Sequence, residues 1–327
     1  MIGYYVHHQG HGHRNRAASI AGAMRTPVTA LSSAPLAPGV FDRVIELARD
    51  DLGEHRDVTA AGMVHWAPIR DPGMRGRMAQ LAAWVEETDP AALVVDVSVE
   101  IAVFARLLGV PVIVVAMPGT RDDSPHQLAY GMADAIIAPW PSAIYEPGWL
   151  RPHLHKTTFT GGISRFAGRT RCVDDAERSD VLVMTGSGGT QISEQTVEAC
   201  RSAYPDMTWR FAGGPGSWLA DPWPAMCNAG VVVGNSGQNT VADLAVAARP
   251  AILIPEDRPF GEQRAVAEMQ RVLQLATVIS HWPELASWPE LCATAAQTPS
   301  RRWSAWETEG AAERAAAAIE EVAQRWA

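Results

Sequence analysis

The chain has 327 residues, 47% hydrophobic and 19% charged, so it can bury a sizeable core, most readily as two domains. Its net charge of -9 argues against a general nucleic-acid binder, whose surface has to attract phosphates. The longest apolar runs are only as long as strands, and one begins directly after Met1, which indicates neither a membrane span nor a signal peptide. We therefore expect a soluble, cytoplasmic protein.

The first half of the chain alternates short apolar runs with longer amphipathic segments. Continuous β-branched runs predict parallel strands buried on both faces, and apolar residues three and four apart predict helices between them. The predicted strands are 2–6, 27–31, 43–47, 92–98, 110–117 and 134–140, and the predicted helices are 16–24, 74–88 and 100–109. The alternation stops at 141–157, a stretch rich in proline and aromatic residues that we interpret as a linker or domain edge.

The alternation then starts again, which predicts a second α/β domain of similar size. Strands with their turns are predicted at 180–189, 208–214, 229–237 and 250–255, and helices at 193–203, 240–248, 262–273 and 309–326. We place an N-terminal domain at 1–155, a second domain at 156–305 and a C-terminal helix at 306–327 that packs back on the N-terminal domain. Two such sheets in series predict a ligand in the cleft between them.

Four loops directly follow predicted strands, where open α/β sheets bind their ligands. Glycine there lets the backbone approach a ligand, and a helix N-terminus offers free N–H groups to an anion. Taken alone, Asn239 or Thr240 is equally well a helix N-cap and Asp243 an acid that stabilises the helix dipole. The loops are "QGHGHRNR" (9–16), "DVS" (96–98), "GSGGT" (186–190) and "GNSGQNT" (234–240).

The segment "GNSGQNTVADLAVAARPAILIPEDRPFGEQRAVA" resembles the nucleotide-sugar half of inverting glycosyltransferases with the two-Rossmann GT-B architecture. The resemblance spans roughly 180–269 and is greatest to the MurG-like family and the macrolide glycosyltransferases. It implies that the turn binds a diphosphate, Asp243 the ribose and Gln263 the donor sugar. Two positions depart from the family pattern: Arg249 replaces a glycine and should affect only a turn, and Val266 replaces an asparagine and puts one contact in doubt.

The resemblance also implies a set of donor-binding residues. "TTFTGGISR" (157–165) is similar to the segment that crosses into the second domain, where an arginine faces the phosphates. We expect the donor to contact Arg165, Ser187, Gly188, Ser236, Gly237, Gln238, Asn239, Thr240, Asp243, Glu262 and Gln263.

The N-terminal half resembles the same families. "PAALVVDVSVEIAVFARLLGVPVIVV" is similar to the macrolide-type segment that begins with a strand-end aspartate, here Asp96, and the opening loop resembles their "G-x-G-H" turn, with His13 as its histidine. The resemblance implies that His13 is the general base and that Asp96 orients it. Gly10, Gly12 and Arg16 would form the acceptor side of this loop.

Other interpretations compete for the histidine-rich opening and for the cysteines. A metal site needs three or four converging ligands, and His7 and His8 would point to opposite faces if they remained on the strand, so we expect neither a metal nor a cofactor beyond the nucleotide sugar. The four cysteines have no CxxC spacing and suit unpaired packing residues in a reducing compartment. These are Cys172, Cys200, Cys227 and Cys292.

The resemblance favours a hexosyltransferase that uses a UDP-sugar, with deoxythymidine diphosphate as the second choice of nucleotide and an unidentified acceptor. A nucleotide-sugar hydrolase or 2-epimerase is the alternative, because "GHRNR" fits the "GHxxR" loop of those hydrolases, and a non-catalytic binding protein is a third. Arg75 and Arg77 in "GMRGRM" form either a cationic lip for a membrane-bound acceptor or a solvated helix start. Trp218 either stacks on the nucleotide base or packs internally.

Overall fold

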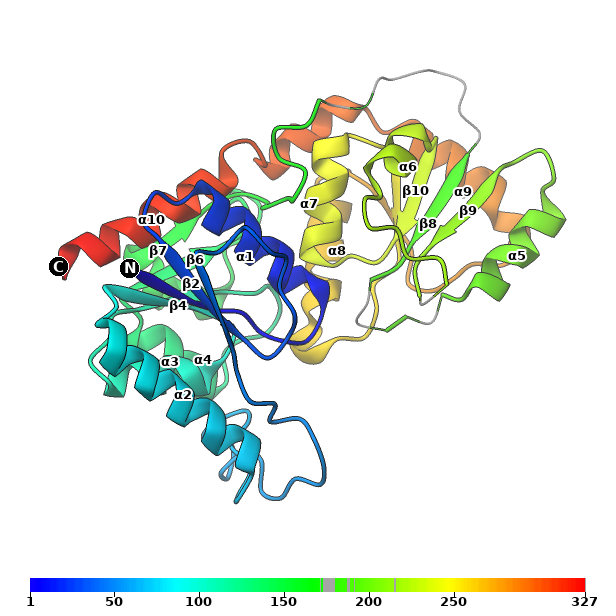
Figure 1. Ribbon diagram of the computed structural model, residues 1–327. Coiled ribbons are helices and arrows are strands. Elements are labelled where there is room, and N and C mark those ends of the chain that lie inside the picture. The colour runs from blue at the N-terminus through cyan, green and yellow to red at the C-terminus, as the bar shows by residue number, and fades with distance from the viewer. Residues whose placement is uncertain (171, 173–179, 187–188, 191, 215, 327) are drawn as a thin grey trace.

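The computed structural model describes residues 1–170, 172, 180–186, 189–190, 192–214 and 216–326. The chain folds around two parallel sheets, which lie side by side in Figure 1. The first sheet has the order β3-β2-β1-β4-β5-β6-β7. Its strands are β1 (Ile2–Tyr5), β2 (Val28–Ser32), β3 (Arg43–Glu46), β4 (Ala92–Asp96), β5 (Val112–Val115), β6 (Ala135–Ala138) and β7 (Thr157–Phe159).

Both faces of the first sheet are buried, as its apolar runs predict. Successive residues of β1 alternate: Tyr4 packs in the core under α1 and α10, whereas Tyr5 packs in the core under α2 and α3. The helices of this half are α1 (His11–Ala23), α2 (Pro72–Thr88), α3 (Val99–Leu107), α4 (Ser124–Met132) and, from the end of the chain, α10 (Ala311–Arg325), with the 3-10 helix η1 at Gly148–Lys156.

The second sheet has the order β12-β11-β10-β8-β9 and is also parallel throughout. Its strands are β8 (Val181–Met184), β9 (Trp209–Ala212), β10 (Val231–Gly234), β11 (Ala251–Leu253) and β12 (Thr277–Val278). Its helices are α5 (Glu194–Ala203), α6 (Trp223–Asn228), α7 (Gln238–Ala247), α8 (Glu262–Val272) and α9 (Trp288–Ala296), with 3-10 helices η2 (Pro259–Gly261), η3 (Leu285–Ser287) and η4 (Ser300–Trp306).

The segment interpreted as a linker contains ordered structure. η1 occupies most of it, and β7 pairs with β6, so the first sheet continues past residue 155. The sequence analysis also missed the short helices α4, α6 and α9, each of which has a proline in its first turn. Proline is tolerated there because the first N–H groups of a helix have no partner inside the helix.

The final helix lies on the first half of the molecule, beside α1 (Figure 1). The buried carboxylate of Glu320 accepts hydrogen bonds from the backbone N–H groups of Arg25 and Thr26 at 2.7 and 2.9 Å, and Arg25 also donates its guanidinium. These bonds fix the C-terminal end of α1, so the two helices form one layer over the sheet.

The chain crosses between the halves twice, and the two crossings touch. Gly162 donates its N–H to the carbonyl of Trp306 at 2.9 Å. At Gly161, where φ is 75°, a Cβ would lie 2.2 Å from the carbonyl oxygen of Glu307, so only glycine fits. Arg314 in α10 donates to carbonyl oxygens of both crossings, those of Thr160 and Glu307.

The cysteines differ from the expectation that all four are unpaired. Cys172 and Cys227 form a disulfide, whereas Cys200 and Cys292 are free and buried. Sequence spacing could not reveal this pair, because its members lie 55 residues apart and only the fold brings them together. Within the described residues, no helix is both long and apolar enough to cross a membrane.

Candidate active site

One cavity of about 1000 Å³ lies between the two halves. Its walls include residues from the loops after β1, β4, β8 and β10, the four loops that the sequence singled out. In each sheet these strands flank the point where the strand order reverses, which is where open α/β sheets leave a crevice. The cavity therefore follows directly from the order of the strands.

The base of the N-terminal wall is a cluster of half-buried His13 with the buried side chains of Arg16 and Asp96. α1 begins at His11, five residues earlier than predicted, so His13 and Arg16 stand three apart on one helical face. His13 Nδ1 lies 3.1 Å from Asp96 Oδ1, and Arg16 Nη2 donates to the same oxygen at 2.6 Å. Arg16 is thus a partner of the carboxylate and not only a loop residue.

The charge of Asp96 is maintained by its neighbours. Burial alone would raise the pKa of this fully buried carboxyl, but Arg16 above all, together with His13, outweighs burial and holds the pKa well below its usual range. Directly after it, Val97 has a φ of 63°, a left-handed conformation that β-branched residues avoid. Such strain costs about 1–3 kcal/mol and clusters at functional sites.

The opposite wall contains the N-terminus of α7. Gly237 is its N-cap, with no side-chain cap, and Gly237, Gln238, Asn239 and Thr240 all line the cavity. The first N–H groups of this helix therefore have no partner from a capping side chain and suit an anion. A Cβ at Gly12 in α1 would lie 2.6 Å from Asn239 Nδ2, so a larger residue there would have to displace the Asn239 side chain.

Asp243 lies one turn into α7 and is almost fully buried. It accepts hydrogen bonds from the Ser164 hydroxyl at 2.7 Å and from Arg165 Nε at 3.1 Å. Burial raises the pKa of Asp243 to about 6, and the contacts with Arg165 and Ser164 only partly offset it. Both Asp243 and Arg165 line the cavity, but Arg165 is engaged by the carboxylate.

Among the other expected donor residues, Glu262 and Gln263 at the start of α8 line the cavity. Ser236 is fully buried, is absent from the cavity wall, and donates its hydroxyl to the Gln263 carbonyl at 2.7 Å. Ser187 and Gly188 lie outside the described residues. On the acceptor side, Gly10 and Gly12 also line the cavity, Gly10 as the N-cap of α1.

The two departures from the family pattern are structural. Arg249 is buried and donates to the Ala229 carbonyl, and its own carbonyl accepts from Trp303 Nε1 at 3.0 Å, so it does more than alter a turn. Ala248 takes the left-handed position that ends α7, with φ 54°. Val266 is fully buried in the core and does not reach the cavity.

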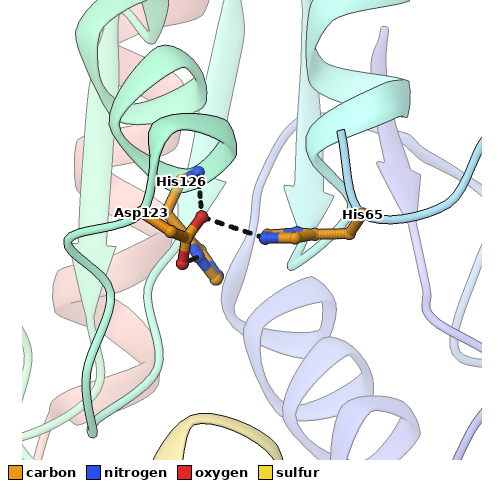
Figure 2. A group of neighbouring side chains, drawn as sticks. All are labelled: His65, Asp123 and His126. Carbon is orange, nitrogen blue, oxygen red and sulfur yellow. Dashed lines mark hydrogen bonds and ion pairs between the residues drawn. The ribbon is translucent and has the colours of Figure 1, made fainter. Parts of the chain in front are cut away.

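A second polar cluster, formed by His65, Asp123 and His126, was missed by the sequence analysis (Figure 2). Asp123 is the N-cap of α4 and lies between the two imidazoles, 3.0 Å from His65 Nε2 and 2.6 Å from His126 Nδ1. Phe260, from the second half, packs on both rings, and Arg121 stacks on Phe260. The sequence "DDSPH" carries an N-cap signal, but His65 stands in a long loop without any pattern.

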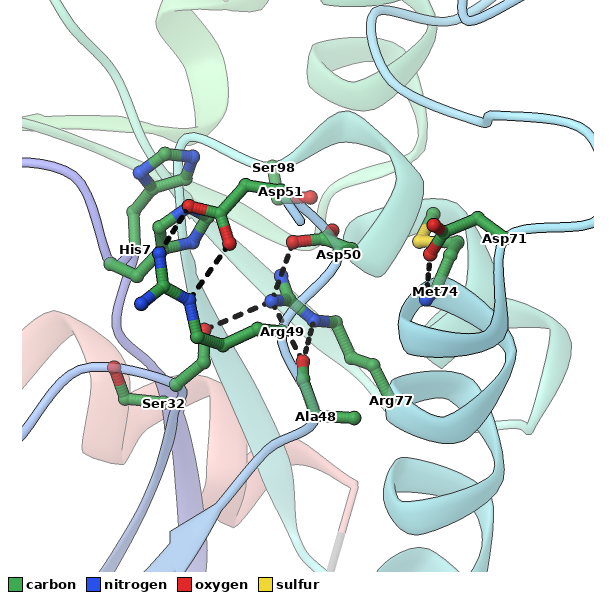
Figure 3. Close-up of polar contacts among 12 residues, drawn as sticks. His7, Ser32, Ala48, Arg49, Asp50, Asp51, Asp71, Met74, Arg77 and Ser98 are labelled. Carbon is green, nitrogen blue, oxygen red and sulfur yellow. Dashed lines mark hydrogen bonds and ion pairs between the residues drawn. The ribbon is translucent and has the colours of Figure 1, made fainter. Parts of the chain in front are cut away.

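The two histidines that follow β1 do not continue the strand. The strand ends at Tyr5, so His7 and His8 do not point to opposite faces; their rings stack 4.9 Å apart, and both line the cavity. Arg77 is also not part of a cationic lip. It is buried, forms an ion pair with Asp50 at 2.7 Å and donates to the carbonyl of Ala48 (Figure 3).

Trp218 lines the cavity and is 42% exposed, and its ring meets His11 edge to face at 4.7 Å. Because the Trp218 side chain is this exposed, it does not pack internally. Its ring is therefore available to a ligand in the cavity.

Solved structures share this fold. The glycosyltransferase of kitacinnamycin is 18% identical with a TM-score of 0.69, and the alignment covers 98% of each chain. Acinetobacter baumannii MurG is 14% identical with a TM-score of 0.63, covering 98% of this chain and 100% of that one. Phytolacca americana UGT2, complexed with UDP-2fluoro-glucose and pterostilbene, is 15% identical with a TM-score of 0.67, covering 99% of both chains.

The chain has the GT-B glycosyltransferase fold. The match extends over 98% of the chain in both cases, so both halves of the fold correspond to those of these proteins. No protein-family model matches the chain, and no curated protein matches it.

Proposed function

We propose that the chain is a hexosyltransferase that moves a sugar from a UDP-sugar to a hydroxyl group of a small-molecule acceptor, with inversion at the anomeric carbon. One observation carries the proposal: half-buried His13, paired with the fully buried Asp96 in one half, lines the same cavity as a helix N-terminus of the other half. The first supplies a base and the second an anion site, the two chemical requirements of the reaction. We place the reaction in the cytoplasm, with no nucleic-acid partner.

In this proposal the acceptor oxygen attacks the anomeric carbon while the bond from that carbon to the diphosphate oxygen breaks. His13 takes the acceptor proton, and Asp96 stabilises the imidazolium that forms. The diphosphate leaves with the electron pair of the broken bond, and its charge is stabilised by the first N–H groups of α7 with Asn239 and Thr240. A single displacement of this kind inverts the anomeric configuration.

The donor nucleoside would lie along α7. Asp243 would accept a hydrogen bond from a ribose hydroxyl, and Glu262 and Gln263 would contact the transferred sugar. Support comes from their positions on one wall of the cavity and from the complex of Phytolacca americana UGT2 with UDP-2fluoro-glucose, a protein of the same fold.

We propose that transfer requires no metal ion. Among the described residues, two groups of side chains have the chemistry of metal ligands, His65 with Asp123 and His126, and His8 with Asp50 and Asp51. Each contacts a buried arginine: Arg121 Nη1 lies 3.0 Å from His126 Nε2, and Arg77 pairs with Asp50. An arginine already engaged with a ligand group competes with a cation for that group.

The test is a panel of UDP- and deoxythymidine-diphosphate sugars, each incubated with the full chain and a library of hydroxylated acceptors, with glycoside formation followed by mass spectrometry. We expect transfer from a UDP-sugar that persists in EDTA. A parallel reaction without acceptor identifies the alternative, because donor cleavage at the same rate without acceptor would mean a hydrolase or epimerase. Absence of both products with every donor would refute the proposal.

A further inference from the structure

Arg16 has a position that base catalysis does not require. It is 2% exposed and contacts three groups at once. Its Nη2 lies 2.6 Å from Asp96 Oδ1 and 3.1 Å from His13 Nδ1, and its Nη1 donates to Gln238 Oε1 of the second half at 3.1 Å. Gln238 is the first residue of α7, so one guanidinium joins the base of the first half to the anion site of the second.

The three contacts create a conflict at a single atom. Arginine only donates hydrogen bonds, so His13 Nδ1 accepts from Arg16 only when it carries no proton. The carboxylate of Asp96 only accepts, so the same Nδ1 bonds to Asp96 only when it does carry a proton. Nδ1 lies 3.1 Å from both groups, and one nitrogen cannot satisfy both.

A count of protons decides between the two states in the free protein. The two hydrogens of Arg16 Nη2 have two acceptors in reach, Asp96 Oδ1 and His13 Nδ1, and both are satisfied when the proton of a neutral His13 is on Nε2. With the proton on Nδ1 instead, an N–H of Arg16 would point at another N–H. In this state Nδ1 accepts from Arg16 and Nε2 carries the proton. Neither ring nitrogen then has a free lone pair with which to take a proton from the acceptor.

We propose that Arg16 is a positioning residue that holds His13 in the Nε2–H form in the free protein and releases it when a nucleotide binds at α7. On release the imidazole changes tautomer: the proton leaves Nε2 and one is bound at Nδ1, whose N–H donates a hydrogen bond to Asp96, and Nε2 then has a free lone pair. This inference rests on the proposed function, because it assumes that His13 is the base and that α7 binds the diphosphate.

The hydrogen bonding of this network is incomplete, as release requires. Among the described residues, three of its buried polar atoms have no hydrogen-bond partner: Arg16 Nε, Asp96 Oδ2 and Gln238 Nε2. Buried polar groups are normally paired, so these atoms are able to form new hydrogen bonds when the network rearranges. Asp96 Oδ2 gives Arg16 or His13 a second acceptor, and Gln238 Nε2 is a donor at the very start of the helix.

Nitrogen NMR of the full chain labelled with 15N-histidine reports which ring nitrogen carries the proton, and the His13→Gln variant assigns the signal. We expect Nε2–H for His13 in the free protein and Nδ1–H after saturation with UDP alone. In Arg16→Met we expect a proton on Nδ1 with or without UDP, because Asp96 is then its remaining partner. Arg14→Met is the matched control on the same helix; Arg14 donates to the Pro35 carbonyl, and its loss should leave the wild-type pattern.

A free protein with Nδ1–H, or an Arg16→Met spectrum equal to wild type, would overturn the proposal. Should Arg16→Met fail to fold, Gln238→Ala tests the link from the other side: His13 should remain Nε2–H even at saturating UDP, and a wild-type response would overturn the coupling. If calorimetry detects no UDP binding, the proposed donor is wrong, while the form of His13 in the free protein still decides the role of Arg16.

Discussion

Asp243→Asn should stabilise the protein near neutral pH. In the folded state burial raises the pKa of Asp243 from 3.8 to about 6, so the folded protein binds more protons than the unfolded chain between these values. Stability therefore falls as pH rises through this interval, and above it the full cost of burying the carboxylate remains. Asparagine has nearly the same shape and never carries this charge.

The magnitude follows from the interval. A difference of about two pKa units corresponds to about 3 kcal/mol at 1.36 kcal/mol per unit, which is the upper limit of the gain for Asp243→Asn. The amide nitrogen facing Arg165 will reduce it. Urea unfolding of both proteins at about pH 7.5 and about pH 4.5 measures the difference, which should be largest at the higher pH and shrink toward the lower one.

Asp221→Asn is the matched control. Asp221 is largely exposed and accepts from Arg169 at 2.9 Å, and this bond lowers its pKa. Its contribution is therefore present near neutral pH and lost on acidification, so its replacement should destabilise slightly or not at all. A stability difference for Asp243→Asn that does not vary with pH would refute the reasoning. A destabilisation at neutral pH would also refute it and would mean that the ion pair with Arg165 outweighs the cost of burial.

The other predictions concern function. His13→Ala should leave UDP affinity in calorimetry nearly unchanged and reduce transfer roughly 100- to 10,000-fold; Asp96→Asn should reduce it too, and the double variant should be little worse than the worse single one. Additive losses would mean that the two residues act separately. Asn239→Ala and Thr240→Ala should together weaken UDP binding by about 1–3 kcal/mol, and unchanged affinity would remove this turn from the site. Gly12→Ala should fold normally but weaken UDP binding, because its Cβ would displace the Asn239 side chain; unaltered affinity would show that this side chain is not needed.

The sequence predicted the fold because its signals are periodic or motif-like. Continuous β-branched runs mark strands buried on both faces, and strand-end glycines mark three of the four loops that meet at the cavity. The resemblance led to the GT-B arrangement that the solved structures share.

What the sequence could not supply are contacts made by single side chains across long separations. Arg16 was treated as a loop residue, because its pairing with Asp96 depends on α1 beginning at His11, and no capping side chain marks that start. The Cys172–Cys227 disulfide and the contact of His65 with Asp123 likewise join residues that no local pattern relates. The same holds for Arg77. The sequence around it is typical of a solvated helix start, but the side chain is buried and paired with Asp50, 27 residues away in the chain.

The adjacency of the two crossing segments has a mechanical consequence. Gly162 and Trp306 are hydrogen-bonded, and Arg314 donates to carbonyl groups on both segments. The halves are therefore connected by two bonded chain segments and not by a single linker. A single linker permits rotation of one half against the other about every axis. Two bonded segments resist twisting of the halves, so bending about the line that joins the two segments is the motion of lowest cost. The two halves should therefore open and close mainly about one hinge axis. A ligand that contacts both walls of the cavity can then set how far the halves are open.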